Sequence, residues 1–151
     1  MSDSQDRVLE PIPSEECYRL LGTQQIGRLG VIAKHYPLIV PVNYALDGHT
    51  IVMRMDEGLK LTATNHANVT FEVDDIDQRA RAGWSVLARG LAEEVEAHHR
   101  AELIERTRST AVEPWAPGEH GHYVRLIVHS VTGRRIIPGS LPPPFEDASY
   151  L

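Results

Sequence analysis

The sequence PVNYALDGHTIVMRMDEGLK, residues 41–60, predicts a β-hairpin with a basic end. Two strand-like runs, residues 38–45 and 50–55, flank the dipeptide Asp47-Gly48. Asp-Gly between β-rich runs is a strong hairpin signal because both residues tolerate a positive φ.

The second strand of this hairpin leads to three residues that suit a phosphate group. Arg54 offers a guanidinium, Gly58 allows a close backbone approach, and Lys60 offers an ammonium. On the first strand, Pro41 cannot donate to a ladder, which indicates an edge or a bulge, and Asn43 adds a side-chain amide. The hairpin therefore predicts a nucleotide-like site, with one strand for a polar ring edge and the other for a phosphate.

Whole-chain composition limits the class of protein. The 151 residues, 42% hydrophobic and 24% charged, are typical of one globular domain with a single core. A net charge of -6 argues against a general nucleic-acid binder. The single cysteine, Cys17, cannot form an internal disulfide, which fits a reducing compartment. No apolar run approaches the roughly 20 residues that a membrane span needs, and the N-terminus is polar. We expect a cytoplasmic protein without a membrane partner.

The pattern along the chain predicts a mainly β domain with short helices. Residues 1–13 read as a flexible arm, residues 14–137 as the domain, and residues 138–151 as a proline-rich, extended tail. Beside the hairpin we expect strands at 26–32, 68–74, 84–96, 123–130 and 132–137, and helices at 14–22, 59–66 and 97–109. With no βαβ rhythm, about six strands predict a small antiparallel barrel.

Other chemical groups give weaker signals. Trp84 can stack on a ring ligand or fill the core. His120 and His122 share one face of a strand, but a zinc site needs three or four ligands and no third residue has a suitable spacing, so no metal site is predicted. Cys17 is expected to be a small buried hydrophobic residue. No Ser/His/Asp order or glutamate pair predicts a hydrolytic site, and no catalytic acid or base can be named.

Several sequence blocks occur in one order: GRLGV, PVNYALDG, a strand ending in Arg with G-x-K after it, VTFEVDD, GWSVLARG and VTGRRI. This order is similar to that of the pyridoxamine 5′-phosphate oxidase-like flavin-binding split-barrel proteins. It most resembles the small actinobacterial branch close to the nitroimidazole-reductase-like members. The resemblance extends from about residue 14 to residue 137.

The resemblance implies a six-stranded antiparallel split β-barrel that forms a homodimer, with two flavin mononucleotide (FMN) sites across the interface. Arg54 and Lys60 would hold the FMN phosphate, with the Leu61 backbone nearby. Val42 and Asn43 would lie along the edge of the isoalloxazine ring. Trp84 and Ser85 would approach the cofactor from a neighbouring strand of the same or the second subunit.

The resemblance also implies an FMN- or deazaflavin-dependent oxidoreductase that acts on a small planar substrate. The alternative is a protein without catalytic activity that uses the same cleft, as a flavin carrier, a sensor or a haem-binding split barrel. The acidic, proline-rich tail differs from the basic C-terminal residues that hold the substrate phosphate in the vitamin oxidases. Arg54 stands near the position where nitroimidazole reductases of the family often have a histidine.

Overall fold

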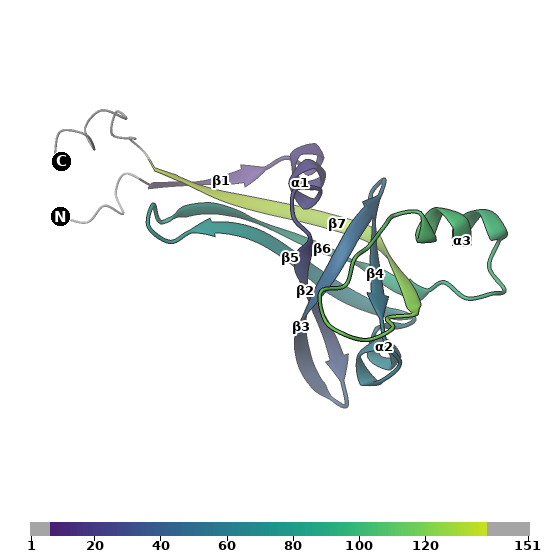
Figure 1. Cartoon of the computed structure of the whole chain (residues 1–151). Coiled ribbons are helices and arrows are strands. Elements are labelled where there is room, and N and C mark those ends of the chain that lie inside the picture. The colour runs from purple at the N-terminus through teal and green to yellow at the C-terminus, as the bar shows by residue number, and fades with distance from the viewer. Residues whose placement is uncertain (1–6, 139–151) are drawn as a thin grey trace.

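The computed structural model describes residues 7–138, which form seven strands and three helices (Figure 1). The strands are β1 (Arg7–Ile12), β2 (Ile26–Ala33), β3 (Tyr36–Asp47), β4 (Thr50–Met55), β5 (Ala67–Asp77), β6 (Ala82–Glu94) and β7 (His122–Pro138). The helices are α1 (Ser14–Leu21), α2 (Leu59–Thr64) and α3 (Ala101–Arg108). No helix within residues 7–138 combines the length and apolar character needed to cross a membrane.

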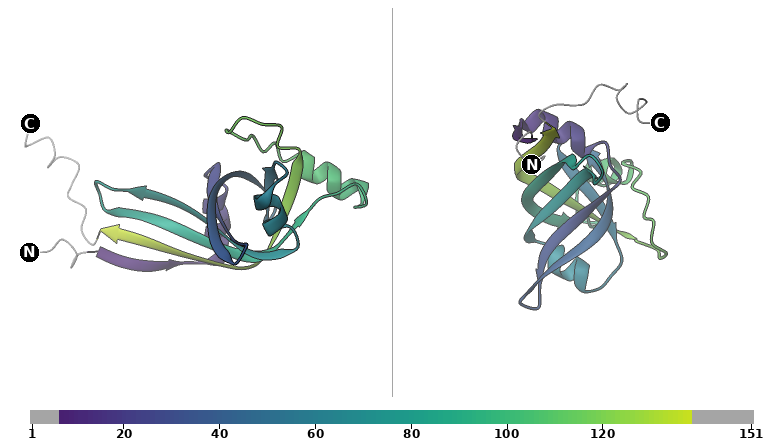
Figure 2. Two further views of the ribbon diagram at one scale, coloured as in Figure 1. Left: turned by 90° about the horizontal axis from the view of Figure 1, so that it is seen from below. Right: turned by 90° about the vertical axis from the view of Figure 1, so that its left-hand side faces the viewer.

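Six of the strands close into a ring. The sheet order is β1-β7-β4-β3-β2-β5-β6, and a further pairing of β6 with β7 closes the six strands from β7 to β6 into a ring, with β1 outside it. Every pair of neighbours is antiparallel. Figure 2 shows the ring on one side and, projecting from it, an arm made by β1 and parts of β5, β6 and β7. The predicted split barrel is therefore confirmed, with seven strands in the sheet rather than six.

The seventh strand lies where a flexible arm was expected. Arg7–Ile12 pairs with β7, from Arg7 opposite Pro138 to Ile12 opposite Gly133. The cause is the length of β7, whose 17 residues extend past the barrel and expose main-chain groups that another strand can pair with. Pro11 is tolerated because β1 is an edge strand. Residues 1–6 and, apart from Pro138, the expected tail lie outside the described residues.

The two last predicted strands are one continuous strand, β7, with an irregularity opposite β6. Arg89 pairs with Ser130, but Gly90 pairs with Val128, so one residue of β7 is extra at this point. A Cβ atom on Gly90 would overlap the carbonyl oxygen of Ile127. The irregularity at Gly90 is thus a β-bulge at which only glycine fits.

The core fills the inside of the ring and the space under α1. Large apolar side chains from five strands have no exposed surface: Leu29, Met53, Phe71, Val86 and Leu126. Each such burial stabilises the fold by about 1.5–3 kcal/mol before the loss of conformational entropy is counted. Cys17 on α1 is also fully buried, and burial raises the pKa of its thiol. It is the small hydrophobic residue that the sequence predicts.

Candidate functional site

The candidate site begins where β3 and β4 separate. The hairpin turn is Gly48-His49, one residue later than predicted, and the pairing runs from Asp47–Thr50 to Tyr44–Met53. One residue beyond the Tyr44–Met53 pair, Asn43 on β3 would lie opposite Arg54 on β4. At this position the described residues show no pairing between β3 and β4, so the two strands have separated. The opening between them therefore has Asn43 on one strand and Arg54 on the other.

A loop that the sequence analysis did not connect with the site enters this opening. We call residues 111–121, which join the end of α3 to β7, the strap. The Trp115 N–H donates to Oδ1 of Asn43 at 2.8 Å, and Nε of Arg54 donates to the His120 carbonyl at 3.1 Å. Both strands of the split are thus bonded to the strap.

Arg54 makes further contacts with the strap. Its Nη1 donates to the Val112 carbonyl at 3.2 Å, and its Nη2 donates to the Glu119 carbonyl at 3.4 Å. The guanidinium carbon lies 5.1 Å from the centre of the Tyr123 ring, a distance at which a cation and an aromatic face attract. Since a guanidinium has five N–H donors, two remain for a ligand.

Asn43 and Val42 differ in what they can offer a ring. Nδ2 of Asn43 donates to the Gln25 carbonyl at 3.2 Å and its Oδ1 accepts from the strap, so one amide N–H remains. The Val42 side chain is 5% exposed and belongs to the core. The Val42 side chain is therefore not available to contact a ligand.

Lys60 and Leu61 lie in the first turn of α2, directly after the separated strands. Leu61 is buried and anchors the helix, whereas Lys60 is half-buried. In residues 7–138 the Lys60 ammonium has no hydrogen bond or ion pair, and only its carbonyl is engaged, by the Thr64 hydroxyl at 2.6 Å. Lys60 is therefore the cation of the predicted pair that is available to an anion.

Trp84 and Ser85 are not brought to this opening within one chain. They lie on β6 near the tip of the β5–β6 hairpin, where Trp84 pairs with Asp75 and Arg135. This part of β6 belongs to the projecting arm (Figure 2). The structure therefore divides the predicted site residues into a group at the barrel and a group on the arm.

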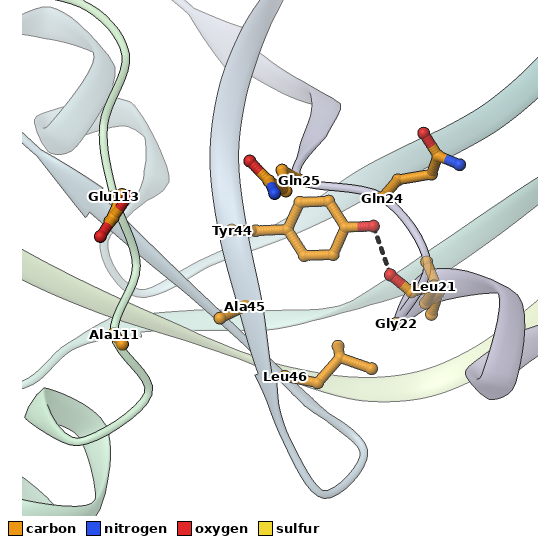
Figure 3. Close-up of a pocket in the computed structure, with 9 residues that line it drawn as sticks. All are labelled: Leu21, Gly22, Gln24, Gln25, Tyr44, Ala45, Leu46, Ala111 and Glu113. Carbon is orange, nitrogen blue, oxygen red and sulfur yellow. Dashed lines mark hydrogen bonds between the residues drawn. The ribbon is translucent and has the colours of Figure 1, made fainter.

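A cavity of about 470 Å³ lies beside the split. Its walls come from the end of α1 and the loop after it, from β3 and from the strap: Leu21, Gly22, Gln24, Gln25, Tyr44, Ala45, Leu46, Ala111 and Glu113 (Figure 3). The Tyr44 hydroxyl donates to the Leu21 carbonyl, and burial raises the pKa of this phenol. Asn43 bonds both Gln25 and Trp115, so it joins two of these walls. The volume falls within the range of small-molecule sites.

Acidic and imidazole groups lie at the end of the strap that leads into β7. The His120 N–H donates to Oδ1 of Asp56 at 2.6 Å, and Nδ1 of His120 lies 3.3 Å from Oδ2 of the same carboxylate. At the start of β7, Nδ1 of His122 lies 2.5 Å from Oε2 of Glu94, and this hydrogen bond raises the pKa of His122. No three His, Cys, Asp or Glu side chains within residues 7–138 converge as a metal site would require.

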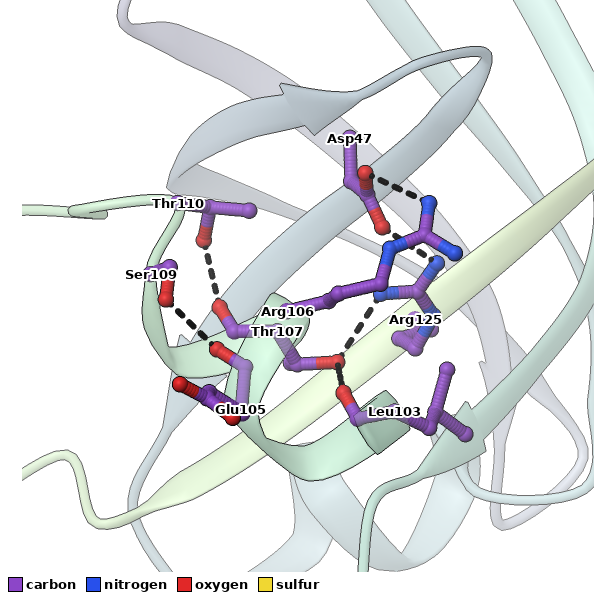
Figure 4. A network of polar contacts seen from close by, with 8 residues as sticks. All are labelled: Asp47, Leu103, Glu105, Arg106, Thr107, Ser109, Thr110 and Arg125. Carbon is purple, nitrogen blue, oxygen red and sulfur yellow. Dashed lines mark hydrogen bonds and ion pairs between the residues drawn. The ribbon is translucent and has the colours of Figure 1, made fainter. Parts of the chain in front are cut away.

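A polar network fixes α3, the helix that precedes the strap (Figure 4). Nη2 of Arg125 donates to Oδ2 of Asp47 at 2.8 Å, and Nη1 of Arg125 donates to Oγ1 of Thr107 at 2.8 Å. Arg106 adds a second ion pair to Asp47 at 3.0 Å. The hydrogen bond with Arg125, followed by that with Arg106, lowers the pKa of Asp47. The hairpin turn and α3 are thus held together by ionised groups.

The strap is the part of the candidate site that the sequence did not indicate. It contains Pro114, Pro117, Gly118 and Gly121, residue types that are typical of an irregular connection. One available signal was its length, because connections of about 12 residues without secondary structure are often functional loops. The strap bonds to Asn43 and Arg54, which are distant from it in the sequence, so no local sequence pattern indicates these contacts.

Comparisons with known proteins find relatives that cover most of the chain. A curated relative, the uncharacterized protein Rv0080 of Mycobacterium tuberculosis, is 30% identical over 143 residues and 91% of each chain is covered. The solved structure of the FAD binding protein from Mycobacterium smegmatis is 30% identical, with a TM-score of 0.64, covering 85% of this chain and 98% of that chain. A conserved protein of unknown function from Corynebacterium diphtheriae is 29% identical, with a TM-score of 0.70 and coverage of 85% and 98%.

The family itself is identified by a family model described as pyridoxamine 5′-phosphate oxidase, which matches residues 13–135. This match covers the barrel, the strap and nearly all of β7. The chain therefore belongs to the pyridoxamine 5′-phosphate oxidase-like family of flavin-binding split barrels.

Proposed function

We propose that the protein binds FMN in the split between β3 and β4 and acts as an oxidoreductase on a small planar substrate. The observation that carries this proposal is the opening itself, with Asn43 on one strand, Arg54 on the other and Lys60 directly after it. The name of the M. smegmatis relative, an FAD binding protein, supports a flavin as the ligand.

The residues present fit a flavin phosphate at the α2 end of the split. Lys60 offers an ammonium that no described residue engages, and Arg54 retains two N–H donors. Phosphate is held well by such charged donors. The Leu61 backbone lies in the same turn.

The ring end fits a flavin edge through Asn43 and the Val42 main chain. The remaining amide N–H of Asn43 and the β3 edge beyond Tyr44 can bond ring oxygens and nitrogens. The neighbouring cavity of about 470 Å³ offers room for a ring or for a substrate placed against it.

The proposal includes a homodimer that completes the site. Three large apolar side chains on β2 and β3 are strongly exposed, with Ile32 at 65%, Tyr36 at 76% and Ile39 at 71%. An apolar surface of this kind is typical of a protein interface. The arm carries Trp84 and Ser85 away from the split of its own chain, so a second copy could bring them to it.

A bound flavin supplies the acceptor and donor of hydride, and the protein supplies binding, orientation and electrostatics. Lys60 would hold the phosphate, and Asn43 would orient the ring. The strap, held between Asn43 and Arg54, would limit access of water from that side. No catalytic acid or base is assigned.

The test is the visible spectrum of the purified protein, followed by titration with FMN, FAD, the deazaflavin coenzyme and haem. We expect retention of FMN through gel filtration at one per chain, in a particle of dimer mass, and oxidation of a nicotinamide reductant. FMN binding without turnover would favour the carrier or sensor alternative. A haem band, or no uptake of any flavin, would overturn the proposal.

A further inference from the structure

Arg54 and Lys60 are six positions apart in the sequence and both were predicted to hold a phosphate, yet their contacts in the structure differ. Three of the five Arg54 donors are bonded to main-chain carbonyls of the strap, at 3.1, 3.2 and 3.4 Å. The Lys60 ammonium has no such partner in the described part of the chain. We infer that Arg54 is a positioning residue that holds the strap as a wall of the site, and that Lys60 is the main ligand of the phosphate.

The strap is held by several contacts besides those with Arg54. It is bonded at its middle to Asn43 and near its end to Asp56, through the Trp115 and His120 N–H groups. Nε2 of His120 lies 2.8 Å from the Ala116 carbonyl, which braces the turn between them. Val112 is 4% exposed, so the strap also has an apolar anchor.

Gly118 shows how closely the strap fits. Its φ is +132°, which favours glycine, and a Cβ atom there would lie 2.7 Å from Oδ2 of Asp56. The φ value therefore favours glycine at this position, whereas the half-exposed Asp56 carboxylate has room to turn away from a Cβ atom.

The position of the strap matters for the ring end of the site. Ala111 and Glu113 form part of the wall of the 470 Å³ cavity beside β3 (Figure 3). A guanidinium is planar and can donate to several carbonyls at once, which an ammonium on a flexible stem cannot do in the same geometry. Arg54 therefore sets this wall, although it lies on the strand assigned to the phosphate.

The inference rests on the proposed flavin site, but its first test needs no flavin. Hydrogen–deuterium exchange of the strap reports the Trp115 and His120 amides, which are bonded to Asn43 and Asp56. In Arg54→Lys the charge is kept and the carbonyl contacts are lost, so we expect exchange in residues 111–121 to rise at least tenfold. Lys60→Ala is the matched control, and its strap should exchange as in the wild type. Unchanged exchange in Arg54→Lys would overturn the inference.

The second test compares FMN with riboflavin, which has the same ring and no phosphate. Lys60→Ala should weaken FMN about 10- to 100-fold, as expected for a charge-assisted contact, and riboflavin less than about twofold. Arg54→Lys should weaken both ligands by the same factor, which leaves their affinity ratio unchanged. Thermal unfolding of both variants checks that the fold persists.

The outcomes separate the inference from the proposed function. If the wild type takes up neither FMN nor riboflavin, the proposed function fails, while the exchange experiment still decides whether Arg54 holds the strap. If FMN binds but Arg54→Lys removes only the preference for FMN over riboflavin, Arg54 is a phosphate ligand and the inference is wrong. An increase in strap exchange when FMN binds to the wild type would also contradict it, since Arg54 would then leave the strap for the phosphate.

Discussion

Asp47 is the residue whose loss should reveal how α3 and the strap are held. Its carboxylate is 16% exposed and accepts from Arg125, whose side chain is 9% exposed. Asp47→Asn would leave the buried guanidinium without a counter-charge. Breaking a buried pair in this way costs about 3–5 kcal/mol, and the partial exposure of Asp47 reduces this to about 2–4 kcal/mol of the free energy of unfolding. For a domain of this size that corresponds to a decrease in Tm of roughly 5–12 °C.

The control is the other ion pair of the same carboxylate. The Arg106 side chain is 57% exposed, so Arg106→Ala should cost only about 0–1 kcal/mol. Urea unfolding of both variants and the wild type, followed by far-UV circular dichroism, gives the two differences under identical conditions. If Asp47→Asn costs no more than Arg106→Ala, the network does not hold α3 in the way argued here.

The pH dependence adds a second check. Because the folded state lowers the pKa of Asp47, its contribution to stability is present above the ordinary carboxyl pKa of about 4 and is lost as pH falls through the lower, folded value. The difference between the wild type and Asp47→Asn should therefore be constant near pH 7 and shrink as the pH falls below about 4. A difference that does not change with pH would show that the substitution acts through packing rather than charge.

Three further predictions concern single residues. Burial, with Asp74 beside it, raises the pKa of Glu72 to about 7, so stability should fall as pH rises through 7, and Glu72→Gln should flatten this slope in urea unfolding. The hydrogen bond with Glu94 raises the pKa of His122, so Glu94→Gln should lower it, as an NMR titration of the imidazole would show; an unchanged titration would contradict the pairing. Gly90→Ala should lower the free energy of unfolding by more than about 2 kcal/mol, because the new Cβ would overlap a β7 carbonyl oxygen; a stable variant would mean that the bulge can shift.

The barrel and the hairpin could be predicted because their signals are local. Alternating apolar residues set which face of each strand is buried, and the Asp-Gly dipeptide located the turn to within one residue. The strand at Arg7–Ile12 could not be predicted in this way, because it depends on how far β7 extends past the barrel, and its own proline argued against a strand.

The candidate site could be predicted only for residues on contiguous segments. Asn43, Arg54 and Lys60 come from one hairpin and the helix after it, so sequence order already places them near one another. Trp84 and Ser85 lie on the arm, and whether they reach a site depends on a second chain. The strap was missed for another reason. Arg54 donates to carbonyls of the main chain, and a carbonyl has the same chemistry whatever the side chain, so no residue pattern marks its partners.

The two basic residues differ in chemistry, so we expect that neither can replace the other. A flexible ammonium can follow a phosphate and needs no fixed fork, which suits Lys60 at the start of a short helix. A planar guanidinium loses little entropy when three carbonyls are already arranged around it, which suits Arg54 at the mouth of the split. In a chain with a net charge of -6, two cations six positions apart in the sequence favour an anion near this end of the split. In the proposed site, the Lys60 ammonium would hold the phosphate of the ligand and the Arg54 guanidinium would hold the strap.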